Sequence, residues 1–474
     1  MGFIASRCRC WCHGFANDEL KKSIMLRVKI KSICLIICLV STSLLGQELY
    51  ELSDCLVFTL NNSPELTAEI LAQEKESISQ YERKSSFLPQ VDAFINYHNY
   101  FNDLPTYIFP QDEGSNLAGI PLTGPYPVPL GLAHNLNTGF EINQTIFDMN
   151  FFGNTAMKQH FQSYQEIKLN IAEEELLYKV ATLFYQIATN MEKDAFLDMN
   201  LGRLKKLQPV VRLQVEQGFA KQTDYDKLLV KTSNLKSKKN KLNTGIKQQL
   251  SYLKLMMGMS QTENIGIEYN KDAGLNADML SVEKGELLEE KMLEEQRELL
   301  QMNAKKINAD YYPRLNAYAA FHFQAQREQF NFFNADQDWY NIHQWGLKLT
   351  VPIMRGLEKK TKKEVSEIVD SQLAFGLEQK QTLGNLEYQN AIVELEAARI
   401  EQVSQRENVE LAERVFDQSE LSYEQGTMLL IDFLDAEATL RESKMIYATT
   451  VLDTRMAELK ILKASGKLKE LVNQ

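Results

Sequence analysis

Apolar and polar residues alternate with a period of two in four segments of the chain, at about 90–101, 136–147, 314–326 and 344–353. In the third segment, residues at every second position are apolar: Leu315, Ala317, Ala319, Phe321, Phe323 and Ala325. Successive side chains of a strand point to opposite faces of its sheet. The alternation therefore predicts four β-strands, each with one apolar face.

The length of these strands, roughly ten residues, is that of a strand that crosses a bilayer. A soluble antiparallel sheet with one solvated face would show the same alternation. Aromatic residues near the strand ends favour the bilayer, because aromatic side chains gather at membrane–water interfaces. The candidates for such an interface are Tyr97, Phe101, Phe323, Trp339 and Trp345.

One long connection joins the two predicted strands of each pair. Segment 102–135 holds six of the eleven prolines, at positions 105, 110, 121, 125, 127 and 129. Because proline has no backbone N–H, we expect no regular structure there. Segment 327–343 is rich in Asn, Asp, Gln and aromatic residues. Both segments are predicted to be exposed loops.

Long helices follow each pair of strands. From about 150 to 208 and from about 357 to 424 the sequence contains almost no Gly or Pro. Sixty helical residues reach ~90 Å, so such helices pack side by side or span a gap rather than fill a compact domain. Each stretch ends at Glu-Gln-Gly, with Gly218 and Gly426 as the residues just past the helix. Two helical hairpins are predicted, with tips at about 218–224 and 426–432.

These features occur twice, which indicates an internal duplication. Val215–Gly218 corresponds to Tyr423–Gly426, and Asp224-Tyr225 corresponds to Asp432-Phe433, each 208 residues later. The predicted organisation is a first repeat, a linker, a second repeat and a tail, at 47–258, 259–285, 286–466 and 467–474. Each repeat runs helix, strand, loop, strand and long helical stretch.

The first 46 residues resemble a targeting segment rather than part of the fold. Three basic residues precede an apolar run from Ile33 to Leu45, which is too short to span a bilayer as a helix but suits a signal peptide. We expect 25–46 to be that peptide and 1–24 to come from an upstream mis-start. Five of the six cysteines lie before residue 47, so the mature chain keeps only Cys55 and forms no intrachain disulfide.

Charge and composition exclude several classes of protein. The chain has 474 residues and a net charge of −11, which argues against a nucleic-acid partner. A mean hydropathy of −0.32 excludes a bundle of membrane-spanning helices. No phosphate loop, zinc-protease motif or nucleophile elbow is present, and the six histidines are scattered. We predict no enzyme activity, no cofactor and no metal site.

The four strands imply an oligomer. The smallest membrane barrels have eight strands, and an open sheet edge in lipid leaves backbone groups unpaired. If these strands lie in a membrane, two or three chains must share one barrel.

Several stretches resemble the TolC-type outer-membrane efflux family. They are Asn62–Leu66, Phe87–Pro89, Tyr312-Pro313, Val351–Ile353 and above all Tyr423–Thr427 with Asp432–Ala436. The resemblance implies a homotrimer with a shared twelve-stranded barrel in outer-membrane lipid and a long α-helical tunnel in the periplasm. It also implies passive export, with a periplasmic adaptor and an inner-membrane transporter as partners.

The resemblance also assigns roles at the hairpin tips. Asp432 and Asp435 match two acids that form rings at the narrow periplasmic entrance of the family. The other interpretation is ordinary helix-start chemistry, with Asp432 as N-cap and Asp435 as a first-turn acid. Asp224 and Tyr423 match residues of a closing latch, but Met428 stands where the family has a base. That salt bridge cannot form here, so we expect Asp224→Ala alone to change conductance little.

Two alternatives remain open. Within the duct, the cargo is either small molecules and drugs or, with an ATP-driven transporter, exported protein. Outside it, a periplasmic coiled-coil scaffold would explain the helices but not the duplicated strand pairs.

Overall fold

The structure, a computed structural model, describes residues 48–85, 87–100, 106–109, 116–117, 120–121, 126–129, 132–269, 284–334 and 336–473. The segments 1–24 and 25–46 and Phe101 lie outside these ranges. Two compact units are present, Met1–Tyr50 with Asn264–Gly266, and Glu51–Glu263 with Ile267–Gln474. The described residues of the smaller unit are Glu48–Tyr50 and Asn264–Gly266. Strands β1 (Glu48–Tyr50) and β8 (Ile265–Ile267) form a two-stranded sheet.

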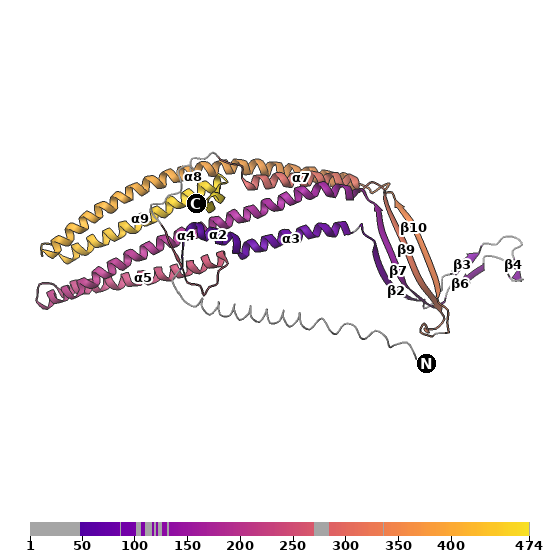
Figure 1. Ribbon diagram of the computed structural model, residues 1–474, viewed down its shortest axis with the longest axis horizontal. Coiled ribbons are helices and arrows are strands. Elements are labelled where there is room, and N and C mark those ends of the chain that lie inside the picture. The colour runs from indigo at the N-terminus through magenta and orange to yellow at the C-terminus, as the bar shows by residue number, and fades with distance from the viewer. Residues whose placement is uncertain are drawn as a thin grey trace, which may run out of the picture. The chain divides into compact units, whose positions relative to one another are not determined.

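The larger unit is mainly helical with a few strands, as predicted (Figure 1). Its helices are α2 (Leu52–Asn62), α3 (Pro64–Ser85), α4 (Met149–Glu216), α5 (Gln222–Met257), α7 (Leu288–Ala309), α8 (Glu358–Glu424) and α9 (Leu430–Ala464), followed by the 3-10 helix η1 (Leu468–Asn473). None of the described helices is both long enough and apolar enough to cross a membrane.

Two helices dominate this unit, α4 with 68 residues and α8 with 67. The side chain of Asp148 caps α4 by accepting a hydrogen bond of 2.9 Å from the backbone N–H of Asn150. α4 and α5 form one hairpin, and α8 and α9 form the other (Figure 1). Each hairpin buries an apolar stripe against its neighbours, which supplies the stability that an isolated helix lacks in water.

Four antiparallel strands form one sheet in the order β10-β9-β7-β2. Their bounds are β2 (Gln90–Asn99), β7 (His134–Phe147), β9 (Arg314–Arg327) and β10 (Tyr340–Thr350). β10 starts inside the segment expected to be a loop, because Tyr340–His343 continue the pairing with β9. β10 ends at Thr350, two residues before Pro352, which has no N–H to continue a ladder.

The expectation that segment 102–135 has no regular structure is wrong for its described residues. Short strands pair there as β3 (Thr106–Phe109) with β6 (Tyr126–Pro129) and as β4 (Asn116–Leu117) with β5 (Ile120–Pro121). Pro127 and Pro129 both lie in β6. A strand of a two-stranded sheet has one free edge, where a missing N–H does no harm.

The register of the large sheet places its apolar residues on one face. Val91, Ile142, Ala319 and Trp345 occupy one level across all four strands, and residues directly opposite each other share a face. At other levels the same face carries further exposed apolar residues: Ile95, Phe140, Phe321, Phe323, Leu347 and Leu349. Exposed fractions reach 75% at Ile95 and 82% at Trp345, so no part of the chain that the structure describes covers these side chains.

A polar cluster connects the strands of both repeats to their helices. Arg314, the first residue of β9, forms ion pairs with Asp148 at 3.3 Å and Asp310 at 3.1 Å. The amide of Asn150 in turn donates to Asp310 at 2.9 Å. These contacts link the start of α4 to the end of α7 and so hold the two repeats together beside the sheet.

Candidate functional site

The two hairpin tips are built in the same way. At the first, Gly218 has φ +81°, its N–H bonds to the carbonyl of Val215, and Phe219 bonds to that of Gln214. At the second, Gly426 has φ +74° and bonds to Tyr423, while Thr427 bonds to Ser422. This double hydrogen bond is the Schellman motif, whose left-handed residue favours glycine. The tips are thus fixed turns rather than loose loops.

An apolar core lies directly behind the tips. It combines residues of all four hairpin helices: Leu197, Leu201, Leu204, Val211, Leu228, Leu235, Ala412, Phe416, Leu430, Phe433, Leu434 and Leu440. Phe433 is central, because its ring stacks on Tyr423 with centroids 5.1 Å apart and contacts Phe416 at 5.7 Å. Met428 packs against this core as a partly buried side chain. Its apolar character therefore suits the place where the resembled family has a base.

Asp432 and Asp435 lie in the first two turns of α9, and both are exposed. The interpretation of Asp432 as N-cap is wrong, because the N-cap is Leu429 and Asp432 is the third helical residue. Its backbone N–H bonds to the carbonyl of Leu429 at 3.1 Å. Asp435 lies beyond the first turn. Helix capping therefore does not explain either acid, although Asp432 still lies where the helix dipole favours a negative charge.

Asp435 forms an ion pair that the sequence did not suggest. Lys231 of α5 places its Nζ 3.0 Å from Oδ1 of Asp435, across 204 positions of sequence. Sequence reasoning missed Lys231 because it stands among other lysines of a polar helix, and no local pattern marks it. The contact joins the hairpin of the first repeat to that of the second.

The residues matched to the latch make other contacts. Asp224 pairs with Lys227 on its own helix, at 3.8 Å. The Tyr423 hydroxyl donates to Oε1 of Gln214 at 3.3 Å, which links α8 to α4. Burial raises the pKa of Tyr423, the bond to Gln214 lowers it, and the nearby charge of Asp224 raises it. The two hairpins are thus joined near their tips by the Tyr423–Gln214 hydrogen bond, the Lys231–Asp435 ion pair and the apolar core.

A buried carboxylate lies further along α9. Glu437 is 1% exposed and receives a hydrogen bond of 3.4 Å from Arg441, while its Oε1 has no hydrogen-bond partner. Burial raises the pKa of this carboxyl, and the charges of Arg441, Lys231 and Arg203 lower it by less. Nothing in the sequence distinguishes Glu437 from the exposed acids of the same helix.

The described aromatic residues proposed for a membrane interface all lie on or beside the four-stranded sheet. Tyr97 and Trp339 both contact Phe332, with ring centroids 6.1 Å and 6.4 Å apart, and the hydroxyl of Tyr97 lies 2.7 Å from Nδ1 of His134. This cluster lies at the end of the sheet away from the long helices. By the register of the strands, Tyr97, Phe323 and Trp345 all lie on the apolar face of the sheet.

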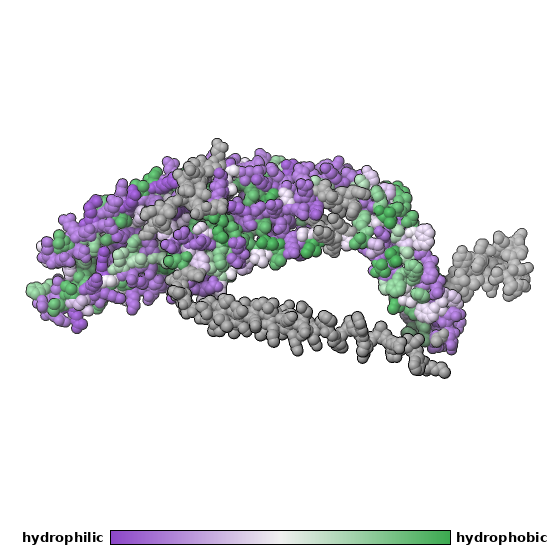
Figure 2. All heavy atoms as spheres, viewed as in Figure 1, coloured by the Kyte–Doolittle hydropathy of each residue, from purple (hydrophilic) through white to green (hydrophobic). Residues whose placement is uncertain are grey.

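Surface hydropathy differs between the strands and the helical hairpins. Figure 2 shows hydrophobic residues gathered over the strands, and a largely hydrophilic surface along the helical hairpins. A lipid-facing sheet and a water-facing helical part would produce this contrast.

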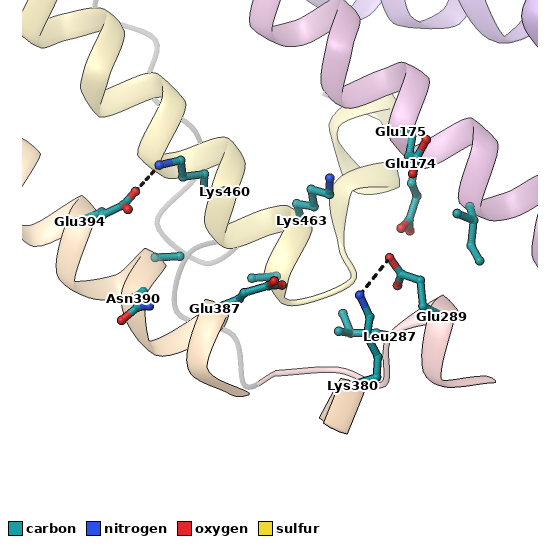
Figure 3. A pocket seen from close by; sticks show the side chains of 13 residues that line it. Glu174, Glu175, Leu287, Glu289, Lys380, Glu387, Asn390, Glu394, Lys460 and Lys463 are labelled. Atoms are coloured by element: carbon teal, nitrogen blue, oxygen red, sulfur yellow. Dashed lines mark hydrogen bonds and ion pairs between the residues drawn. The ribbon is translucent and has the colours of Figure 1, made fainter. Parts of the chain in front are cut away.

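A separate cavity of about 370 Å³ lies between α4, α7, α8 and α9 (Figure 3). It is lined by five carboxylates and three lysines, of which Lys380 pairs with Glu289 at 3.7 Å and Lys460 pairs with Glu394. Burial raises the pKa of Glu174, which Lys469 lowers. The lining is salt-bridged and lacks a nucleophile with an adjacent base, so its chemistry suits packing between the repeats.

Comparisons with known proteins point to one kind of molecule. Residues 291–467 match the family model described as outer membrane efflux protein. Among curated proteins none matches significantly.

Solved structures match the fold over most of the chain. A membrane protein from Pseudomonas aeruginosa is 14% identical, with 88% of this chain and 93% of that chain covered and a TM-score of 0.64. The CmeC outer membrane channel of Campylobacter jejuni is 12% identical, with 88% and 85% covered and a TM-score of 0.64. The outer membrane protein VceC of Vibrio cholerae is 12% identical, with 88% and 96% covered and a TM-score of 0.63. Together with the family match, this fold confirms the resemblance drawn from the sequence.

Proposed function

We propose that this chain, which resembles the TolC-type outer-membrane efflux family in sequence and in fold, is the outer-membrane exit duct of a tripartite efflux system. In this proposal three copies share a twelve-stranded barrel in the outer membrane, and their hairpins form a tunnel in the periplasm. Small molecules or drugs pass through it without chemical change. A periplasmic adaptor and an inner-membrane transporter supply the cargo and the energy.

The observation that carries the proposal is the uncovered apolar face of the four-stranded sheet. Large exposed side chains such as Ile95, Trp345 and Leu347 lie on that face. A contiguous apolar surface of this kind is covered by lipid or by another protein. The outer strands β2 and β10 also lack a neighbour on their free sides within the described residues, and lipid does not tolerate such edges. Sharing the barrel between copies satisfies both requirements.

At the other end of the helices, the hairpin tips are proposed to form the periplasmic entrance. Asp432 and Asp435 are exposed on α9, and three-fold symmetry would bring six carboxylates together. A ring of carboxylates favours cations over anions and binds polyvalent cations. Because the tips carry fixed turns over an apolar core, the carboxylates would be held at defined positions.

Single-channel conductance in planar bilayers tests this assignment. We expect the double substitution Asp432→Ala/Asp435→Ala to lower cation selectivity and to weaken block by divalent cations. Asp224→Ala is the matched comparison, since Asp224 lies at the corresponding place in the first hairpin and pairs with Lys227. That variant should change conductance little. Unchanged selectivity and unchanged divalent block in the double variant would contradict a constriction at these residues.

A further inference from the structure

Lys231 is the base that the structure brings to the proposed entrance. Its Nζ lies 3.0 Å from Oδ1 of Asp435, and its side chain is 32% exposed, against 69% for Asp435. The ammonium group is therefore half-shielded by the packed helices, while the carboxylate extends toward solvent. In contrast, no ion pair of Asp432 occurs among the described residues.

The position of Lys231 is fixed from both sides along α5. Leu228, three residues before it, and Leu235, four residues after it, are buried in the apolar core behind the tips. The hydroxyl of the adjacent Thr232 bonds to the carbonyl of Leu228 at 2.8 Å. Residues three and four apart lie on the same side of a helix, so these anchors direct Lys231 toward α9.

The ion pair between Lys231 and Asp435 contributes little to stability but strongly changes the charge at the hairpin tips. Exposed ion pairs contribute little to stability, and the two hairpins are already held together by a core that includes Phe433 and Leu434. The effect on the charge of the proposed pore is larger, because each Lys231 ammonium group cancels the charge of one Asp435 carboxylate at the place where ions would pass. With three copies, six carboxylates would then carry a net charge of about three.

We propose that Lys231 determines the ion selectivity of the entrance by neutralising Asp435, so that Asp432 provides the free carboxylate of the constriction. This inference rests on the proposed function, because it requires the tips to line a pore. It adds a residue from the first repeat to a site otherwise built from the second. It also replaces the missing latch base near Met428 with a base of different position and role.

The test measures reversal potentials in a KCl gradient, and block by Mg²⁺, for single channels in planar bilayers. Lys231→Gln should raise the cation-to-anion permeability ratio about threefold or more and lower the half-blocking Mg²⁺ concentration by a similar factor. Lys231→Arg keeps the charge and should behave like the unchanged protein. Adding Asp435→Asn to Lys231→Gln should reverse most of the effect.

The matched control is Lys227→Gln, which removes the same charge one turn earlier on α5. Lys227 pairs with Asp224 at 3.8 Å rather than with an acid of α9. We expect its selectivity and Mg²⁺ block to stay within about 1.5-fold of the unchanged protein, because Lys227 pairs with Asp224 of the first hairpin and not with a carboxylate of the proposed ring.

The outcomes separate this inference from the proposed function. If Lys231→Gln has the selectivity and Mg²⁺ block of the unchanged protein while Asp432→Ala/Asp435→Ala alters them, the inference is wrong and the constriction stands. If neither variant changes them although channels form, the tips do not form the constriction and both proposals fail. Equal shifts in Lys231→Gln and Lys227→Gln would reduce the effect to general surface charge and overturn the specific role of Lys231.

Discussion

Glu437 is a buried carboxylate whose ionised form lacks a full set of partners. One oxygen accepts from Arg441 and the other has no hydrogen-bond partner. An unsatisfied buried polar group costs about 1–3 kcal/mol, whereas a net hydrogen bond contributes about 1 kcal/mol. Desolvation therefore outweighs the nearby cations, in agreement with the upward shift of the pKa of this carboxyl.

This balance predicts a pH-dependent gain in stability for Glu437→Gln. Because the pKa is higher in the folded state, the ionised carboxylate destabilises the fold at pH 7, and this penalty vanishes below the unfolded pKa of about 4.3. We expect the variant to be more stable by about 1 kcal/mol at pH 7 and to lose that advantage near pH 4. Thermal unfolding of the helical signal at both pH values measures it.

Glu442→Gln is the control for that experiment, since Glu442 is exposed on the same helix. It should leave the unfolding midpoint nearly unchanged at both pH values. A loss of stability for Glu437→Gln at pH 7 would mean that the cations around Glu437 hold its charge more strongly than burial opposes it.

Contacts between distant residues explain why the surroundings of Asp432 and Asp435 could be predicted only in part. Asp432 and Asp435 were found by their motif, but the partner of Asp435 lies 204 positions away. The burial of the Glu437 side chain likewise depends on how the four hairpin helices pack. Neither property has a local signature, because a helix of mixed lysine and glutamate looks the same whether its charges are paired or solvated.

At the scale of elements, the hairpin tips depend on two left-handed glycines. A Cβ added at Gly218 would meet no atom within 4 Å, so its only cost is the backbone conformation at φ +81°. That cost is about 1 kcal/mol for a residue with a Cβ. Gly218→Ala should therefore raise the population of the locally opened tip, and with it the rate of amide exchange, about fivefold. Hydrogen-exchange mass spectrometry of peptides from the tip measures this rate.

Gly202 is the matched comparison in the same hairpin, because its change to alanine should stabilise the local structure rather than destabilise it. It lies inside α4 and also has open space around its Cβ position. Alanine is the better helix former there, so Gly202→Ala should slow exchange nearby, by an amount that corresponds to about 1 kcal/mol. Slower exchange at the tip in Gly218→Ala would show that the turn does not require its left-handed residue.

Helices and strands were easier to predict from the sequence than contacts between distant residues, because the patterns that mark helices and strands lie within a few neighbouring residues. The period of two marks β9 at Arg314–Arg327, where the expectation was about 314–326. Glu-Gln-Gly marks the end of α8 because the turn chemistry is contained in three residues. The short strands β3 and β6 were missed, since their prolines indicate a loop unless the pairing partner is known.

At the scale of the whole molecule, the open edges of the sheet predict that several copies associate, and the resemblance to the efflux family predicts three. Three chains give twelve strands and two give eight, so the detergent-corrected mass of the protein extracted from membranes distinguishes the two barrels. We expect three copies. A monomer in a soluble fraction would instead support the periplasmic scaffold.

The edges themselves can be tested by cross-linking, because the one described cysteine does not interfere. Cys55 is buried, and burial raises the pKa of its thiol to about 12, so little reactive thiolate forms at neutral pH. Asp92 on β2 and Gln344 on β10 lie at one level of the sheet and on opposite edges. With both changed to cysteine, a bismaleimide should link copies into species of up to three chains.

The same level of the sheet provides the control. Glu141 and Ala320 are direct partners on the inner strands β7 and β9, so cysteines there should link within one chain and leave its mass unchanged. Asp92→Cys or Gln344→Cys alone should give no three-chain species, because a ring joins unlike edges. A product that stops at two chains would favour an eight-stranded barrel and would leave four rather than six of the Asp432 and Asp435 carboxylates at the tips. If the copies share a barrel as proposed, the pairing at the sheet edges thus determines how many hairpin pairs meet at the other end of the helices.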